Sequence, residues 1–147
     1  MKLFTQEEAD KLISILKESL SEEFSFPNQN VKSNFEVIST DGEHLFKIDI
    51  YQCLSNTAKI NHTAIIKKDG VVLLELHIGE TQRHKNPDGK YIYGSHWHIY
   101  TEKHGRQFAI PAEIEDCNNF TENLSKFFDK FNLIKRPNIF FQQTISV

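Results

Sequence analysis

The chain has few cysteines and no long apolar run. Only Cys53 and Cys117 occur among 147 residues, and they are too few and too far apart for a disulfide scaffold or a zinc knuckle. This favours a reducing compartment. No signal-peptide pattern opens the chain, and no stretch of about 18 apolar residues that could span a bilayer occurs anywhere in it. These absences predict a cytoplasmic protein with no membrane partner.

An excess of positive charge is also missing. The net charge is −3 with the histidines neutral, so there is no global field that would attract nucleic acid or anionic lipid. Any nucleic-acid binding must therefore come from a local patch. Tryptophan and methionine occur once each, whereas 12 phenylalanines predict a strongly aromatic core. At this length we expect a single domain, residues 1–147.

Amphipathic helices are predicted near both ends of the chain. Thr5 and Glu8 have the spacing of a capping box, and apolar residues at helical spacing continue from there to about Leu20. Asn119 and Glu122 resemble a second capping box. The helix that they would start carries an apolar stripe formed by Phe120, Leu124, Phe127, Phe128 and Phe131.

Between the helices, after a polar linker over Ser21–Lys32, the apolar period changes to two, which is typical of strands. Asp41-Gly42 and Asp69-Gly70 suit tight hairpin turns. They would join strands near Phe35–Ile38 and Phe46–Tyr51, and then strands at about Thr57–Lys67 and Val71–Ile78.

The predicted fold class is α+β. We expect an antiparallel β-meander of about five to six strands, with an N-terminal and a C-terminal helix packed on one face. The tail, Ile139–Val147, is either a final edge strand or an arm, and periodicity does not decide between them.

Strand parity sorts the side chains of this sheet onto two faces. One face is apolar and includes Trp97, which we expect in the core. The other is too rich in titratable groups to be buried, so any chemistry belongs there. It collects Lys47, Asp49, Tyr51, Glu75, His77, His96, His98 and Tyr100.

Three histidines form the candidate site. His96 and His98 point the same way from one strand, and the turn Asn86-Pro87-Asp88-Gly89 can bring His84 back to them. Two strand histidines with a third from a loop are a known ligand set for zinc or another first-row divalent metal. Asn86 and Asp88 are interpreted as turn scaffold, and His44, His62 and His104 as ordinary surface or loop residues.

A metal-free site is the alternative reading of the same histidines. One imidazole would take the proton from a ribose 2′-OH and the other would protonate the leaving oxygen. Lys47 or Arg106 would stabilise the charge, with Tyr100 assisting. That constellation predicts cleavage of RNA.

Two segments carry a family resemblance: His84-Lys85-Asn86-Pro87-Asp88-Gly89 and His96-Trp97-His98-Ile99-Tyr100-Thr101-Glu102. They resemble a family of uncharacterised bacterial and prophage proteins known as a domain of unknown function. The likeness runs from Thr5-Gln6-Glu7-Glu8-Ala9-Asp10 to the C-terminal helix. One departure is His77, where an acidic residue is expected. In architecture and in the His-x-His pair, the chain also resembles, more distantly, TumE-type toxins of bacterial toxin–antitoxin pairs.

Three functional hypotheses follow. The leading one is an RNA-cleaving toxin-like module, with an antitoxin as its partner. In the second, the chain is a non-enzymatic phage or mobile-element inhibitor of a host defence complex, and acidic residues such as Glu75, Glu80 and Asp88 matter more. The third is a metal-dependent enzyme acting on a small molecule.

Overall fold

The computed structural model describes residues 4–53 and 59–141. In this part of the chain it contains two helices and a series of strands, most of them short. Their bounds are α1 Gln6–Ser14, β1 Lys17–Ser19, β2 Glu23–Phe26, β3 Val31–Ser39, β4 Leu45–Gln52, β5 Ile60–Ile66, β6 Val72–Ile78, β7 Arg83–Lys85, β8 Tyr91–Tyr93, β9 His96–Ile99, β10 Ala109–Pro111, α2 Phe120–Lys130, β11 Leu133–Lys135 and β12 Asn138–Phe141.

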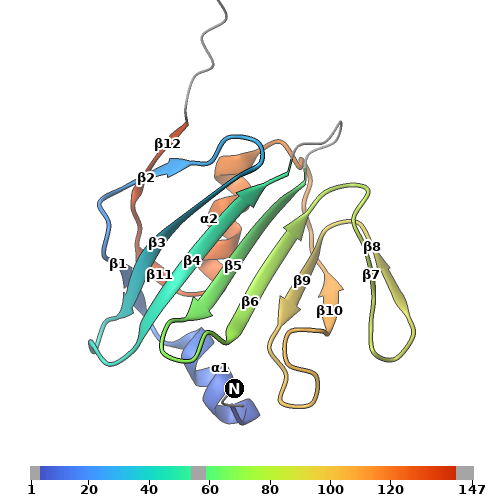
Figure 1. Cartoon of the computed structure of the whole chain (residues 1–147), viewed down its shortest axis with the longest axis horizontal. Coiled ribbons are helices and arrows are strands. Elements are labelled where there is room, and N and C mark those ends of the chain that lie inside the picture. Colours follow the sequence, from blue (N-terminus) through green and yellow to red (C-terminus); the bar gives the residue numbers. More distant parts are fainter. Residues whose placement is uncertain (1–3, 54–58, 142–147) are drawn as a thin grey trace, which may run out of the picture.

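A large, mostly antiparallel sheet dominates the molecule (Figure 1). Its eight strands run in the order β10-β9-β6-β5-β4-β3-β1-β11, and only the β1–β11 pair is parallel. The α+β class and the central meander are confirmed, but the estimate of five to six strands is too low. The additional strands β1, β10 and β11 have three residues each, which is too short to show a period in the sequence.

Helix α2 covers the apolar face of the sheet, behind it in Figure 1. Asn119 caps it by accepting a hydrogen bond from the Glu122 amide, as predicted. Phe127 stacks on Trp97 from β9, with 6.2 Å between ring centroids, and Phe128 meets Phe35 of β3 edge-on. The predicted apolar stripe of this helix therefore forms the core together with the sheet.

The first helix is shorter than predicted and lies at one end of the sheet (Figure 1). The Thr5–Glu8 capping box is present, but the helix ends at Ser14, not at about Leu20. Leu16 and Leu20 are 51% and 56% exposed, because the chain there has become β1 and its apolar spacing no longer follows a helix face.

Lys17 explains why the helix stops early. This lysine is fully buried, and its Nζ donates to the carbonyls of Ile13, Ile15 and Phe131 at 2.7–2.8 Å. Nζ also lies 3.9 Å from the centroid of the Phe131 ring. The ammonium thus binds the carboxyl ends of both helices, where free carbonyls favour a cation.

The predicted linker and tail pair with each other. Phe24 and Phe26 of β2 are buried, so Ser21–Lys32 is not a plain polar linker. Strand β12 lies parallel to β2, which makes the start of the tail a strand in a small second sheet. Residues 54–58, at the start of the predicted third strand, and 142–147, at the end of the tail, lie outside the described residues.

Gly42 and Gly70 have φ angles of +79° and +69°, as the two predicted hairpin turns require. No helix within residues 4–53 and 59–141 is long and apolar enough to cross a bilayer.

Candidate metal centre

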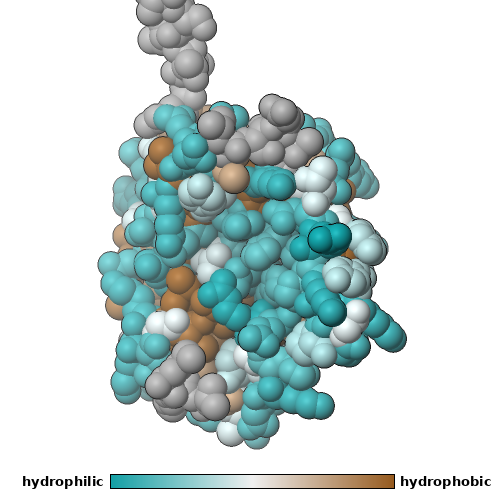
Figure 2. Space-filling view, turned by 45° about the vertical axis from the view of Figure 1, so that its right-hand side comes forward, coloured by the Kyte–Doolittle hydropathy of each residue, from teal (hydrophilic) through white to brown (hydrophobic). Residues whose placement is uncertain are grey.

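The face of the sheet opposite α2 carries polar side chains in register across four strands. Figure 2, turned toward this side of the molecule, shows a mostly hydrophilic surface. Two neighbouring rows cross β4, β5, β6 and β9. They are Asp49, Thr63, Glu75 and His98 in one row, and Tyr51, Asn61, His77 and His96 in the other.

Three histidines converge where these rows end. One ring nitrogen each of His77, His96 and His98 lie within 4.8 Å of one another. The ring centroids are 4.7 to 5.1 Å apart. An ion centred among nitrogens at that widest spacing would be about 2.8 Å from each, whereas Zn–N bonds are about 2.0–2.1 Å. Each nitrogen would therefore have to move inward by roughly 0.7 Å for the three to bind a zinc ion.

Each of these imidazoles has one nitrogen already bound to an oxygen. Nδ1 of His98 lies 2.8 Å from the Arg106 carbonyl, and Nδ1 of His96 lies 2.9 Å from the Gly94 carbonyl. A carbonyl only accepts, so these nitrogens carry the proton and each Nε2 keeps a lone pair. Nε2 of His98 is buried and has no hydrogen-bond partner. Such outer contacts are what orients histidines on a metal.

His96 and His98 are nearly inaccessible to solvent, and this suppresses their protonation. Burial and, after it, the neighbouring His77 lower the pKa of His98 to about 4, against the opposite effect of the Arg106 carbonyl. Burial also lowers the pKa of His96 below its ordinary value. Both imidazoles are thus neutral near pH 7, which is the form that binds a metal.

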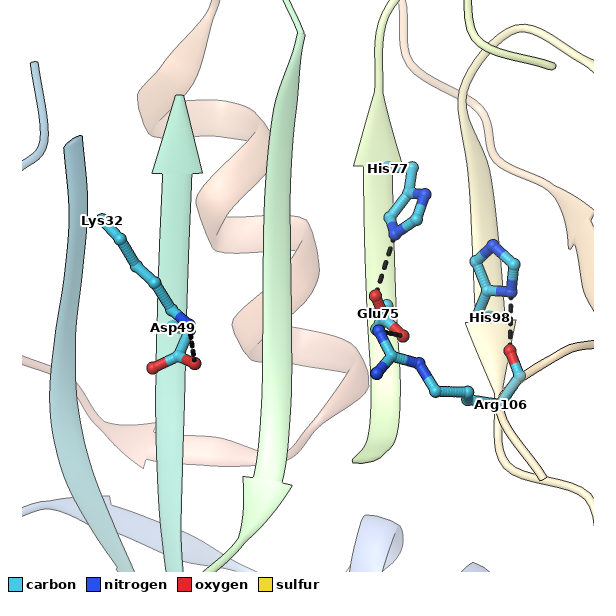
Figure 3. Close-up of polar contacts among 6 residues, drawn as sticks. All are labelled: Lys32, Asp49, Glu75, His77, His98 and Arg106. Carbon is cyan, nitrogen blue, oxygen red and sulfur yellow. Dashed lines mark hydrogen bonds and ion pairs between the residues drawn. The ribbon is translucent and has the colours of Figure 1, made fainter. Parts of the chain in front are cut away.

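Glu75 holds the third histidine. Its buried carboxylate lies 2.9 Å from His77 Nε2 on one side and pairs with the Arg106 guanidinium on the other (Figure 3). Burial alone would raise the pKa of Glu75, but the hydrogen bond to His77 and the charge of Arg106 outweigh it and hold the pKa below its usual value. The ionised carboxylate accepts a hydrogen bond from the Nε2–H group of His77, so in the neutral ring Nδ1 keeps the lone pair.

His84 lies beside the set, on the β7–β8 hairpin. Its ring meets that of His98 edge-on at 4.5 Å between centroids, and its Nε2 is 2.7 Å from the Gln107 carbonyl. Buried Asn86 ties the hairpin to β10, since its side chain both donates to and accepts from the backbone of Ala109. The scaffold role predicted for Asn86 agrees with this geometry, and so does the return of His84 to the histidine pair.

The other predicted site residues are placed differently. Lys47 lies two strands from Glu75 on the same face and is 3.6 Å from Asp49. Arg106 reaches the cluster through its carbonyl and through Glu75. Tyr100 was expected on the polar face, but it is buried in the core, where its hydroxyl bonds both backbone groups of Phe4.

Two histidines were misjudged from the sequence. His77, a departure from the family pattern that was left out of the candidate site, belongs to the converging set, and its predicted place on the same face as His96 and His98 was the signal for this. His62 is not a surface residue: it is fully buried against Phe127, and neither ring nitrogen has a partner. His62 is two residues from both Ile60 and Ala64, and residues two apart on a strand share a face, so the sequence pattern places it on the apolar face.

A shallow depression adjoins the cluster on the same face. Its volume is about 340 Å³, and its lining mixes charged groups of both signs and other polar side chains with Tyr51 and the aliphatic residues Ile65 and Val72. The residues around it include Lys32, Asp49, Tyr51, Asn61, Thr63, Glu75, His77 and Arg106.

Comparison with known proteins adds a family assignment. Residues 4–133 match the model of a family of unknown function, DUF6978. The chain belongs to this family. The match spans both helices and the whole histidine cluster, so the candidate centre lies within the DUF6978 region. No curated protein and no solved structure matches the chain.

Proposed function

We propose that His77, His96 and His98 bind a first-row divalent metal ion, with zinc the simplest choice, and that the protein is a metal-dependent hydrolytic enzyme. One observation carries the proposal. All three imidazoles have one nitrogen engaged by an oxygen, and in His98 the remaining nitrogen is buried with no partner. An unpaired buried lone pair among two further imidazoles is costly without an ion.

The ligand type favours a catalytic over a structural ion. Structural zinc sites are usually closed and rich in cysteine, whereas catalytic sites have three protein ligands and an open position. Cys53 and Cys117 take no part in the described cluster. A bound ion would supply an activated water and polarise a carbonyl or phosphoryl oxygen. The adjoining depression offers the place for a substrate.

The chain's own residues then have distinct tasks. Glu75 fixes the orientation of His77, and the Arg106 carbonyl fixes that of His98. His84 adds a fourth imidazole. Its Nε2 contacts the Gln107 carbonyl, so Nδ1 is the nitrogen left to exchange a proton. We assign His84 to proton transfer at the edge of the centre rather than to the ligand set.

Elemental analysis tests the metal site. Protein purified without a metal-affinity tag should contain near-stoichiometric zinc, manganese or iron, and the His96→Ala/His98→Ala double variant should lose it. His44→Ala is the matched control, because His44 lies on the β3–β4 turn and outside the cluster. His84→Ala should retain the metal. Wild-type protein that stays metal-free even after incubation with zinc ions would refute the proposal.

An RNA-cleaving toxin remains the second candidate, in a metal-assisted form. A metal-free acid–base pair needs one imidazolium, and burial disfavours that form for both His96 and His98. Growth arrest on expression and RNA cleavage abolished by a chelator would support the toxin. Cleavage that survives complete metal removal would instead support the acid–base mechanism. The antitoxin and the host defence complex stay predictions, as does the cytoplasmic location.

A further inference from the structure

The depression beside the histidines is suited to a small molecule. Its volume of about 340 Å³ is at the low end of ligand pockets, which span roughly 300–1,000 Å³. On its floor Asn61 pairs directly with His77, and Thr63 with Glu75. Cross-strand neighbours have Cβ atoms about 4.5–5.5 Å apart, so a ligand on β5 lies within one strand spacing of the cluster.

Two hydrogen-bond acceptors in the lining have no donor. Oδ1 of Asp49 and Oδ1 of Asn61 are both buried and unpartnered. Asp49 is 4% exposed, and the Lys47 ammonium lies 3.6 Å from its Oδ1, beyond hydrogen-bond distance. Leaving a buried acceptor unpaired is costly, which favours a ligand that brings O–H or N–H donors.

The charges around the depression select against ions. Lys32 is 3.1 Å from the second oxygen of Asp49, and Arg106 pairs with Glu75, so both cations are already neutralised (Figure 3). An anion would have to displace these carboxylates and would meet unpaired acceptors. A cation would have to displace Lys32 or Arg106 from these same carboxylates. A hydroxyl group both donates and accepts, and therefore suits every polar group in the lining.

We propose that this depression binds a neutral polyhydroxyl molecule about the size of a monosaccharide, with Asp49 and Asn61 accepting its hydroxyl protons. Tyr51, half-buried in the lining, supplies an apolar wall for the C–H face of such a ring. The binding of this molecule is independent of the function proposed above. Only its role as the substrate of the metal centre rests on that function.

Lys32 is the part of the site that must move. The two free acceptors are covered in this conformation, and the Lys32 side chain crosses from β3 toward Asp49 (Figure 3). That side chain is 57% exposed, so it can swing into solvent, whereas the buried carboxylate of Asp49 needs a replacement donor. A ligand hydroxyl that donates to Asp49 can supply that donor and so take the place of the Lys32 ammonium.

Ligand-observed and backbone-amide NMR titrations test the proposal on the full chain, as purified and after chelation. The probes are D-ribose and myo-inositol as neutral polyols, inorganic phosphate as the anion and putrescine as the cation. We expect millimolar binding of at least one polyol, with shifts at Tyr51, Asn61 and Thr63 in both preparations. Binding of phosphate or putrescine alone at these residues, or of no probe, would overturn the proposal.

Variants locate the binding. Asn61→Leu keeps the side-chain size but removes the acceptor, and should weaken polyol binding roughly tenfold. Asn138→Leu is the control, since Asn138 is exposed on β12 outside the depression. Asp49→Asn, nearly isosteric, repeats the test should Asn61→Leu fail to fold. Unchanged affinity in both folded variants would overturn the proposal, whereas polyol binding by a protein that never takes up metal would refute only the proposed enzyme.

Discussion

Replacing His62 by leucine should stabilise the protein. His62 is fully buried on the apolar face between Ile50 and Leu76 of the flanking strands, and neither of its ring nitrogens has a partner. Leucine has a similar volume and no polar atoms to satisfy. Relief of the unpaired buried nitrogens should raise the free energy of unfolding at neutral pH by about 1–3 kcal/mol.

The same substitution should reduce sensitivity to acid. Burial lowers the pKa of His62 from 6.5 to about 3, so between these values the unfolded chain is protonated at this site and the folded one is not. Stability is therefore lost as the pH falls below 6.5. The loss from His62 alone is about 2 kcal/mol between about pH 8 and pH 5, and approaches about 5 kcal/mol below the folded pKa.

Urea denaturation at both pH values measures these effects. The His62→Leu variant should have a higher midpoint than wild type, and the difference should widen by about 2 kcal/mol at the lower pH. His44→Leu, at a half-buried site on a turn, controls for a general effect of removing a histidine. A destabilised His62→Leu variant, or a gap that does not grow in acid, would show that the ring nitrogens have partners in solution and refute the reasoning.

Other changes test the cluster and its support. Glu75→Gln should weaken metal binding about 10- to 100-fold, because the charged partner of His77 is lost, and a competition titration with a chromophoric chelator measures this. Glu36→Gln is the control: it removes the carboxylate of the exposed ion pair to Lys67 and should leave metal affinity unchanged. If Glu75→Gln and Glu36→Gln changed metal affinity equally, Glu75 would not be the residue that orients His77. Tyr100→Phe should lower the free energy of unfolding by about 1–3 kcal/mol, since it deletes two buried hydrogen bonds to Phe4, but should leave metal content intact; loss of metal in a folded variant would return Tyr100 to the site.

The central strands and the second helix were predictable because each has a strong local signal. Alternation in β4 and β6 placed Asp49, Glu75 and His77 on the open face, and the capping pair Asn119–Glu122 marked the start of α2. His96 and His98 were found for the same reason, since residues two apart on a strand share a face.

Long-range contacts account for most of what sequence reasoning missed. Nothing near Lys17 in the sequence indicates that the Phe131 carbonyl will bind its ammonium, so the end of α1 was placed too late. Strand parity with His98 predicted Tyr100 on the polar face. Its hydrogen-bond partner Phe4, however, is 96 residues away along the chain, and no local pattern indicates that contact. The contact of Arg106 with Glu75 likewise depends on the loop between β9 and β10.

The β7–β8 hairpin has a consequence for how this protein can diversify. Strands β6 and β9 pair directly, so the hairpin between them is an excursion that the main sheet does not need for its continuity. His77, His96 and His98 are on the sheet, whereas His84 is on the excursion. Selection or an engineer can therefore vary the hairpin, and so change what faces the histidine centre, as long as Asn86 keeps its two bonds to Ala109 of β10.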